Sequence, residues 1–132
     1  MNTRNLKRTR DYLAAHPGHY NQEIWANPCG TPACVAGAAV VGCGGRILSR
    51  RNYVPDQCVT ADGAMETIPN YAEELLGLDR AERGDMFHAF PYQYRERTAD
   101  ASPPSVEEAL AMLDYAIEHG KVRWPPRTTK HP

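Results

Sequence analysis

The cysteines are the residues of this chain that are best suited to catalysis or metal binding. Cys29 and Cys34 head the segment 27–42, which reads N-P-C-G-T-P-A-C-V-A-G-A-A-V-V-G. A Thr-Pro pair such as Thr31-Pro32 is typical of a helix start, so we predict that Cys34 occupies the third position of a helix. There, free amides and the helix dipole would lower the pKa of its thiol. Cys34 is therefore the candidate catalytic residue of a cysteine-dependent hydrolase or transferase.

Packing is the competing interpretation of Cys34, and it is the one we favour. A papain-like site needs a histidine on a later strand, whereas His88 and His119 fall in predicted helices and His131 in a C-terminal tail. Buried cysteine is also an ordinary core residue. The catalytic constellation is incomplete, and we expect that the protein is not an enzyme.

A zinc site is a further alternative for the cysteines. Cys29 and Cys34 have the spacing of a chelating pair, and Cys58 with an upstream histidine could complete the ligand set. Cys43 would lie beyond the far end of the predicted helix, too far to ligate the same ion. We predict no bound metal, no cofactor and reduced thiols, with a metal or a disulfide among Cys29, Cys34 and Cys58 as the open alternative.

Composition excludes a membrane-spanning protein. Of the 132 residues 42% are hydrophobic, but the run of apolar residues and glycines over 35–45 is too short to cross a bilayer. The basic N-terminus lacks the apolar stretch of a signal peptide. We therefore expect a cytoplasmic protein with a single domain over residues 1–124 and a flexible tail over residues 125–132.

Charge is distributed unevenly along the chain. Residues 1–51 contain seven Lys or Arg against two acids, whereas residues 52–120 contain four against fourteen. Arg4, Lys7 and Arg8 share one face of the first predicted helix and, with Arg46, Arg50 and Arg51, could contact a phosphate backbone. Nucleic-acid binding is the alternative that we do not favour, because the segment that imitates a helix-turn-helix carries acids that repel phosphate.

Periodicity and capping signals predict a mainly α fold, a compact bundle of about five helices with one short β-hairpin. Residues 31–41 are small and apolar on every side, which indicates a central helix surrounded by the others. Strands near 58–60 and 65–68 would pair around a turn at Asp62-Gly63. The start signals of the other helices are Asn2 or Thr3, Pro69, the capping box of Asp79 with Glu82 and that of Ser105 with Glu108.

Several blocks of the chain have a familiar order and spacing: C-G-T-P-A-C-V-A-G-A-A at 29–39, A-E-E-L-L-G-L at 72–78, M-F at 86–87 and G-K-V-R-W at 120–124. Together they resemble a loose group of small uncharacterised proteins of bacteria, especially actinobacteria, and their phages, marked by a C-G-T-x-x-C-x-A-G block. The resemblance covers most of residues 15–124. It implies a phage or mobile-element origin and no particular mechanism.

Protein binding is the function that these features favour. Phe90, Tyr92 and Tyr94 lie in a segment without periodicity and could form an aromatic interaction surface. Arg4, Lys7 and Arg8 are the other candidate binding residues. We therefore expect a small accessory protein that binds a host or phage protein.

Overall fold

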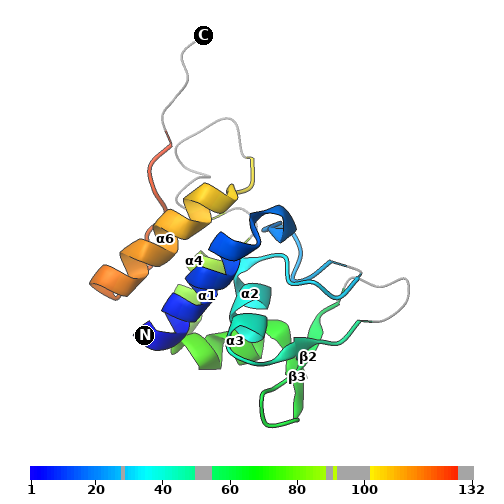
Figure 1. Cartoon of the computed structure of the whole chain (residues 1–132). Helices are drawn as coiled ribbons and strands as arrows, with labels where there is room; N and C mark the ends of the chain where they lie inside the picture. Colours follow the sequence, from blue (N-terminus) through cyan, green and yellow to red (C-terminus); the bar gives the residue numbers. More distant parts are fainter. Residues whose placement is uncertain (28, 50–54, 89–90, 92–101, 128–132) are drawn as a thin grey trace.

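The computed structural model describes residues 1–27, 29–49, 55–88, 91 and 102–127. These residues form a mainly α fold with one small antiparallel sheet, as the sequence predicts (Figure 1). The helices are α1 Thr3–Ala15, the 3-10 turn η1 Pro17–His19, α2 Val35–Gly42, α3 Ile68–Leu76, α4 Arg80–Phe87 and α6 Val106–His119. The strands are β1 Arg46–Ile47, β2 Gln57–Val59 and β3 Met65–Thr67, in the sheet order β1-β2-β3.

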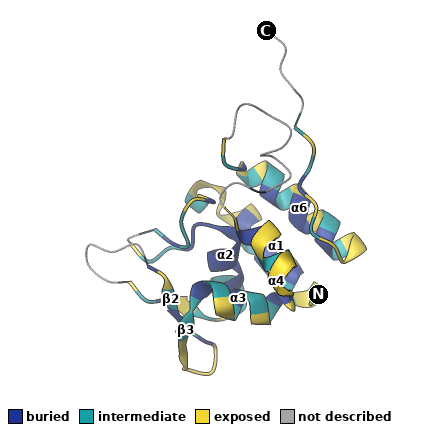
Figure 2. Cartoon of the chain, turned by 180° about the vertical axis from the view of Figure 1, so that it is seen from behind, coloured by how far each residue is buried: buried dark blue, intermediate teal, exposed yellow. Residues whose placement is uncertain are grey.

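Helix α2 is the centre of the fold, which confirms the prediction. Every residue from Val35 to Val40 is buried, and α1, α3, α4 and β1 all pack against this helix (Figure 2). The helix is shorter than predicted, because it begins at Val35 and not at Thr31-Pro32. Pro32 instead pairs with Ala26 in an isolated β-bridge, which holds this segment extended until Cys34, the N-cap residue.

Helix α1 packs on α2 through a close backbone contact. A Cβ atom on Gly42 would lie 3.0 Å from the carbonyl oxygen of Arg8, so the two helices approach closely because this residue has no side chain. The core face of α1 contains Leu6, Thr9 and Leu13, and the Thr9 hydroxyl donates to the Asn5 carbonyl.

The predicted hairpin is present as β2 and β3, which pair with Val59 opposite Met65. Gly63, with φ of 94°, allows the tight turn between them. Strand β1 is an additional element, and its two residues are too few to show a period in the sequence. Ile47 and Cys58 are buried and face the core, so alternation places Val59 and Met65 on the outer face of the sheet.

The remaining helices begin and end where their capping signals predict. Asp79 with Glu82 and Ser105 with Glu108 form complete capping boxes at α4 and α6. Beyond α6 the chain returns across that helix, and the buried Trp124 donates its indole N–H to the Asp85 carbonyl at 2.8 Å. None of the helices in the described ranges is long and apolar enough to span a membrane.

Candidate functional site

Cys34 is enclosed in the core and is a poor nucleophile. Its side chain is 0% exposed, and its thiol points to the carbonyl oxygen of Trp25 at 3.7 Å. Burial raises the pKa of Cys34 to about 11, and this effect outweighs hydrogen bonding from the amides of Ala36 and Gly37. The expectation that the start of the helix lowers this pKa is therefore wrong, because the sulfur is removed from water as well as placed beside the helix terminus.

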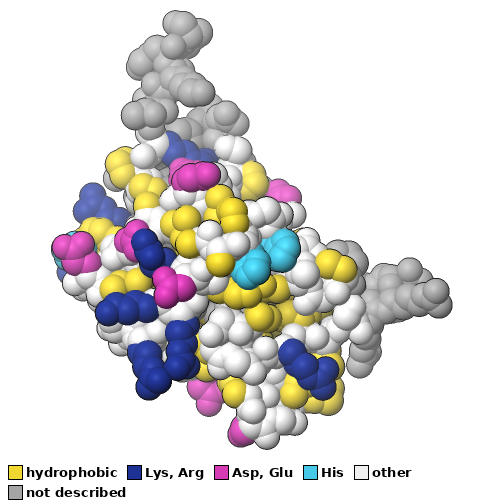
Figure 3. Space-filling model, viewed as in Figure 1, with side chains coloured by type: hydrophobic (Ala, Val, Ile, Leu, Met, Phe, Trp, Pro, Cys, Tyr) yellow, Lys and Arg dark blue, Asp and Glu magenta, His cyan; other side chains and the backbone are white. Residues whose placement is uncertain are grey.

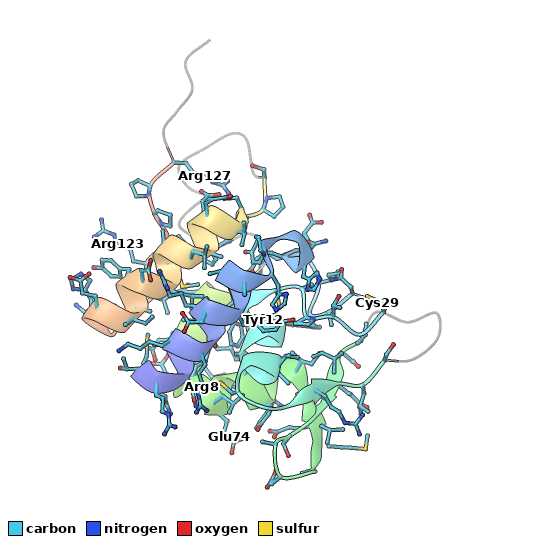
Figure 4. The ribbon with its side chains drawn as sticks, in the orientation of Figure 1. Arg8, Tyr12, Cys29, Glu74, Arg123 and Arg127 are labelled. Atoms are coloured by element: carbon cyan, nitrogen blue, oxygen red, sulfur yellow. The ribbon has the colours of Figure 1, made fainter. Side chains whose placement is uncertain are left out.

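The other cysteines differ in exposure, and all four are free thiols. Burial raises the pKa of Cys58 to about 11 and also raises the pKa of the half-buried Cys43. Cys29 is exposed at a turn (Figure 4), and a hydrogen bond from the Thr31 hydroxyl lowers the pKa of its thiol. The thiolate of Cys29 is thus the one that forms most readily, which the sequence alone did not indicate.

Histidines gather close to the cysteine segment without forming a metal centre. The rings of His16 and His19 stack at 5.3 Å between centroids, and the ring of Tyr12 lies 4.6 Å from that of His16. Within the described residues, no three His, Cys, Asp or Glu side chains lie close enough to hold one metal ion. The zinc ligand set drawn from Cys29, Cys34 and Cys58 does not assemble here.

Basic residues collect where the N-terminal half of α1 lies beside the C-terminal end of α6. Arg10 of α1 donates to Asp114 of α6 at 2.5 Å, and the two helices run antiparallel (Figure 1). Lys121 and Arg123 follow α6, and Arg123 lies back over Tyr115 of that helix. Figure 3 shows several basic side chains on this side of the molecule, with acidic side chains among them. We call Arg4, Lys7, Arg8, Lys121 and Arg123 the basic end.

The basic end differs from the other basic residues in its ion pairs. Arg4, Lys7 and Arg8 are all exposed, and none of the five residues forms an ion pair with a described carboxylate. By contrast, Arg83 pairs with Glu73 and Arg127 with Glu108, contacts that join separate elements. Arg8 and Arg123 are labelled in Figure 4, on α1 and beside α6. Three of the predicted binding residues are thus close together, and Lys121 and Arg123 extend the set.

The predicted aromatic surface cannot be placed. Phe90, Tyr92 and Tyr94 lie outside the described residues. The prediction that they form an interaction surface stays a prediction.

Two shallow pockets lie on the described surface. The first, of about 280 Å³, is lined by Gln22, Glu23, Ile24, Trp25, Phe87 and His88. Its Gln22 is buried and already satisfied: Nε2 donates to the carbonyls of Met86 and His88, and Oε1 accepts from the Tyr20 hydroxyl and the Val35 amide. The amide of Gln22 therefore holds the surrounding backbone together and has little capacity left to bind a ligand in this pocket.

The second pocket is almost wholly apolar. It measures about 240 Å³ and lies between α6 and the returning C-terminal segment, lined by Ala111, Tyr115, Arg123, Trp124, Pro125 and Pro126. The guanidinium of Arg123 lies over the Tyr115 ring, 5.6 Å from its centroid. Sequence reasoning missed this pocket, because it forms only when the segment that follows α6 folds back onto that helix.

The β2–β3 hairpin presents the opposite charge to the basic end. The pKa of Glu66 is raised by burial and then by the nearby carboxylates of Glu74 and Asp62, which shows that these three acids lie close together. Met65, beside Glu66, is 65% exposed. The register of the sheet places Glu66 on the inner face with Cys58, whereas Met65 shares the outer face with Val59 and Arg46.

Comparison with known proteins adds no relative. No protein-family model, no curated protein and no solved structure matches the chain. The resemblance to small actinobacterial and phage proteins accordingly stays a prediction from the sequence blocks.

Proposed function

We propose that this protein is a non-enzymatic accessory protein that binds an acidic surface of a partner protein through its basic end. The observation that carries the proposal is the gathering of Arg4, Lys7, Arg8, Lys121 and Arg123 without an ion pair to a described carboxylate. Like charges spaced three and four residues apart on a helix repel, so this arrangement contributes nothing to the stability of α1. Complementary acids on a partner would remove that repulsion.

The state of Cys34 supports a binding protein over the alternative of a cysteine hydrolase or transferase. A thiol that is wholly buried, with a pKa of about 11, is protonated at neutral pH and inaccessible to a substrate. The resemblance to small phage and bacterial proteins supports a partner from the phage or its host.

The experiment compares two double variants with the same change in charge. Arg4→Glu/Lys7→Glu reverses two cations of the basic end, whereas Arg46→Glu/Arg80→Glu reverses two other exposed cations without a described ion pair. The tagged chains are incubated with nuclease-treated actinobacterial lysate, and retained proteins are identified by mass spectrometry. We expect a protein that the wild type and the Arg46/Arg80 variant retain and that the Arg4/Lys7 variant loses.

Two outcomes would overturn the proposal. The first is that no protein is retained above the resin background, and the second is that both double variants retain the same proteins. If proteins are retained only when the nucleic acid is left in the lysate, the basic end binds a phosphate backbone, which is the second candidate function. Binding should then weaken steeply between 50 and 200 mM salt, with a slope that reflects the few phosphates contacted.

A further inference from the structure

The turn between β2 and β3 contains a pair of residues that can rearrange without an enzyme. Asp62-Gly63 is the only Asp-Gly or Asn-Gly pair in the sequence. Because glycine has no side chain to hinder its backbone nitrogen, that nitrogen can attack the carboxyl group of the preceding aspartate. The turn projects from the helices into solvent, and residues 61–65 are all exposed (Figure 2). A Cβ atom on Gly63 would meet nothing within 4 Å, so the pair is open to water.

The rearrangement needs no reagent other than water. The Gly63 nitrogen forms a bond to Cγ of Asp62, its proton passes to solvent, and one carboxyl oxygen leaves as water. The product is a five-membered cyclic imide, which water then opens. Opening at the side-chain carbonyl restores aspartate, whereas opening at the main-chain carbonyl gives isoaspartate, in which Cβ has become part of the main chain. One water leaves and one returns, so nothing is oxidised or reduced.

The main chain of Thr60 holds the attacking nitrogen. The Gly63 N–H donates to the Thr60 carbonyl at 3.0 Å, and this bond must open before a base can remove the Gly63 proton. The Thr60 N–H donates in turn to the Ala64 carbonyl at 2.7 Å, which closes the turn at the ends of the two strands. The nucleophile of the rearrangement is therefore engaged in the folded hairpin.

The hydroxyl of Thr60 holds the group that would be attacked. It donates to Oδ1 of Asp62 and accepts from the Ala64 amide at 3.0 Å. Thr60 is only 6% exposed, so its hydroxyl is fixed relative to the turn. Hydrogen bonding, first of all from this hydroxyl, lowers the pKa of Asp62 and keeps its carboxylate ionised. An ionised carboxylate is a poor electrophile, because its oxygen can leave as water only after protonation.

We propose that Asp62-Gly63 is a site of isoaspartate formation and that the Thr60 hydroxyl suppresses this modification in the folded chain. Isoaspartate lengthens the main chain by one atom inside a turn that is closed by hydrogen bonds at both ends. The modified turn cannot keep Val59 opposite Met65, so the modification disrupts the β2–β3 pairing. This inference does not involve the basic end, and it stands or falls separately from partner binding.

The test follows isoaspartate at position 62 while the full chain is stored at mildly acidic pH. There, an aspartate with its ordinary pKa is protonated in part, and Asp62 with its lowered pKa is protonated less. Peptide mapping by mass spectrometry separates the aspartate and isoaspartate peptides and detects the imide, which is lighter by one water. Thr60→Val and Thr60→Ala remove the hydroxyl, whereas Thr60→Ser keeps it. We expect both hydroxyl-free variants to convert severalfold faster than the wild type, and Thr60→Ser to convert at the wild-type rate.

A second hydroxyl in the same turn provides the matched control. The Tyr71 hydroxyl accepts from the Ala61 amide at 3.1 Å and so ties the turn to α3 without contacting Asp62 through that bond. Tyr71→Phe should therefore convert at the wild-type rate, and the wild type unfolded in urea should convert at least as fast as Thr60→Val. The proposal is overturned by hydroxyl-free variants as slow as the wild type, by Thr60→Ser as fast as Thr60→Val, by equal acceleration in Tyr71→Phe, or by an unfolded chain that converts no faster than the folded one.

Discussion

Gly37 of α2 lies directly against the carbonyl oxygen of Trp25: a Cβ atom on Gly37 would be 2.2 Å from that oxygen and 3.2 Å from the Cβ of Pro32. The segment that contains Trp25 therefore crosses the central helix at Gly37, where the helix has no side chain. This contact explains why a glycine stands in the middle of a helix, where it costs about 0.5–1 kcal/mol relative to alanine.

Gly37→Ala should destabilise the fold. The clash is with backbone, which cannot move aside as a flexible side chain does, so we expect a loss of about 1–3 kcal/mol or more. Thermal unfolding monitored by circular dichroism should show a melting temperature lower by several degrees. The control is Gly84→Ala in α4, where a Cβ would meet nothing within 4 Å and should stabilise the helix by about 0.5–1 kcal/mol. Equal effects at the two glycines would contradict the packing described for α2.

Gln22→Ala should be as damaging as a core substitution, although the residue is polar. The change removes the donor to the carbonyls of Met86 and His88 and the acceptor of the Val35 amide. A buried group left without its partner costs about 1–3 kcal/mol. Urea unfolding should show this loss, whereas Asn21→Ala at an exposed neighbouring position should cost less than about 1 kcal/mol. A Gln22 variant as stable as the Asn21 variant would contradict the network.

The four thiols should react in a fixed order with Ellman's reagent. Cys29 is exposed and its pKa is lowered by the Thr31 hydroxyl, so it should react first at pH 7.5. The Thr31→Val variant should slow that reaction. Cys34 and Cys58 are buried and should react only after the chain is unfolded. Fast labelling of Cys34 in the native protein, read by mass spectrometry of its peptide, would revive the cysteine-enzyme alternative.

Stability should fall as pH rises from about 9 to 11. The pKa of Cys34 is raised from 9.0 to about 11 on folding, so above pH 9 the unfolded chain loses this proton while the folded chain keeps it. The contribution of this thiol to the free energy of unfolding is complete below pH 9 and is lost by about pH 11. The loss is at most roughly 1.4 kcal/mol per pH unit. Tyr12, whose pKa is also raised by burial, acts in the same direction.

The part due to Cys34 can be isolated by substitution. Cys34→Ala should lower stability at pH 7 because it leaves a small cavity, but it should make the decline between pH 9 and 11 shallower. Melting temperatures of the two proteins across this range give the comparison. Parallel curves would show that Cys34 does not titrate differently in the folded and unfolded chain.

The helices and the hairpin could be predicted because their signals are local. The two capping boxes and the Asp62-Gly63 turn depend only on a few neighbouring residues, and each is confirmed. The predicted start of α2 was wrong because the β-bridge between Ala26 and Pro32 holds the segment extended. This pairing prevails over the Thr-Pro signal, since a single cap is worth only about 1 kcal/mol.

The candidate sites were predictable only in part. Arg4, Lys7 and Arg8 share a helix face, so spacing places them together, but Lys121 and Arg123 join them only through the antiparallel packing of α1 and α6. The predicted direction of the Cys34 pKa shift was wrong, because the effect of burial is larger than that of the nearby helix terminus. Burial depends on the whole fold. The apolar pocket lies between α6 and the segment around Trp124 that folds back onto it. Neither of these two segments predicts a pocket by itself.

The complete enclosure of α2 has a consequence for how the molecule opens. A helix wrapped by α1, α3, α4 and β1 cannot expose its amides by fraying of any single neighbour. Hydrogen exchange at Ala38, Ala39 and Val40 should therefore proceed only through global unfolding, and these amides should report the full free energy of the domain. Helix α6, which packs chiefly on α1, is the element that can detach first and exchange in partial openings while α2 stays protected.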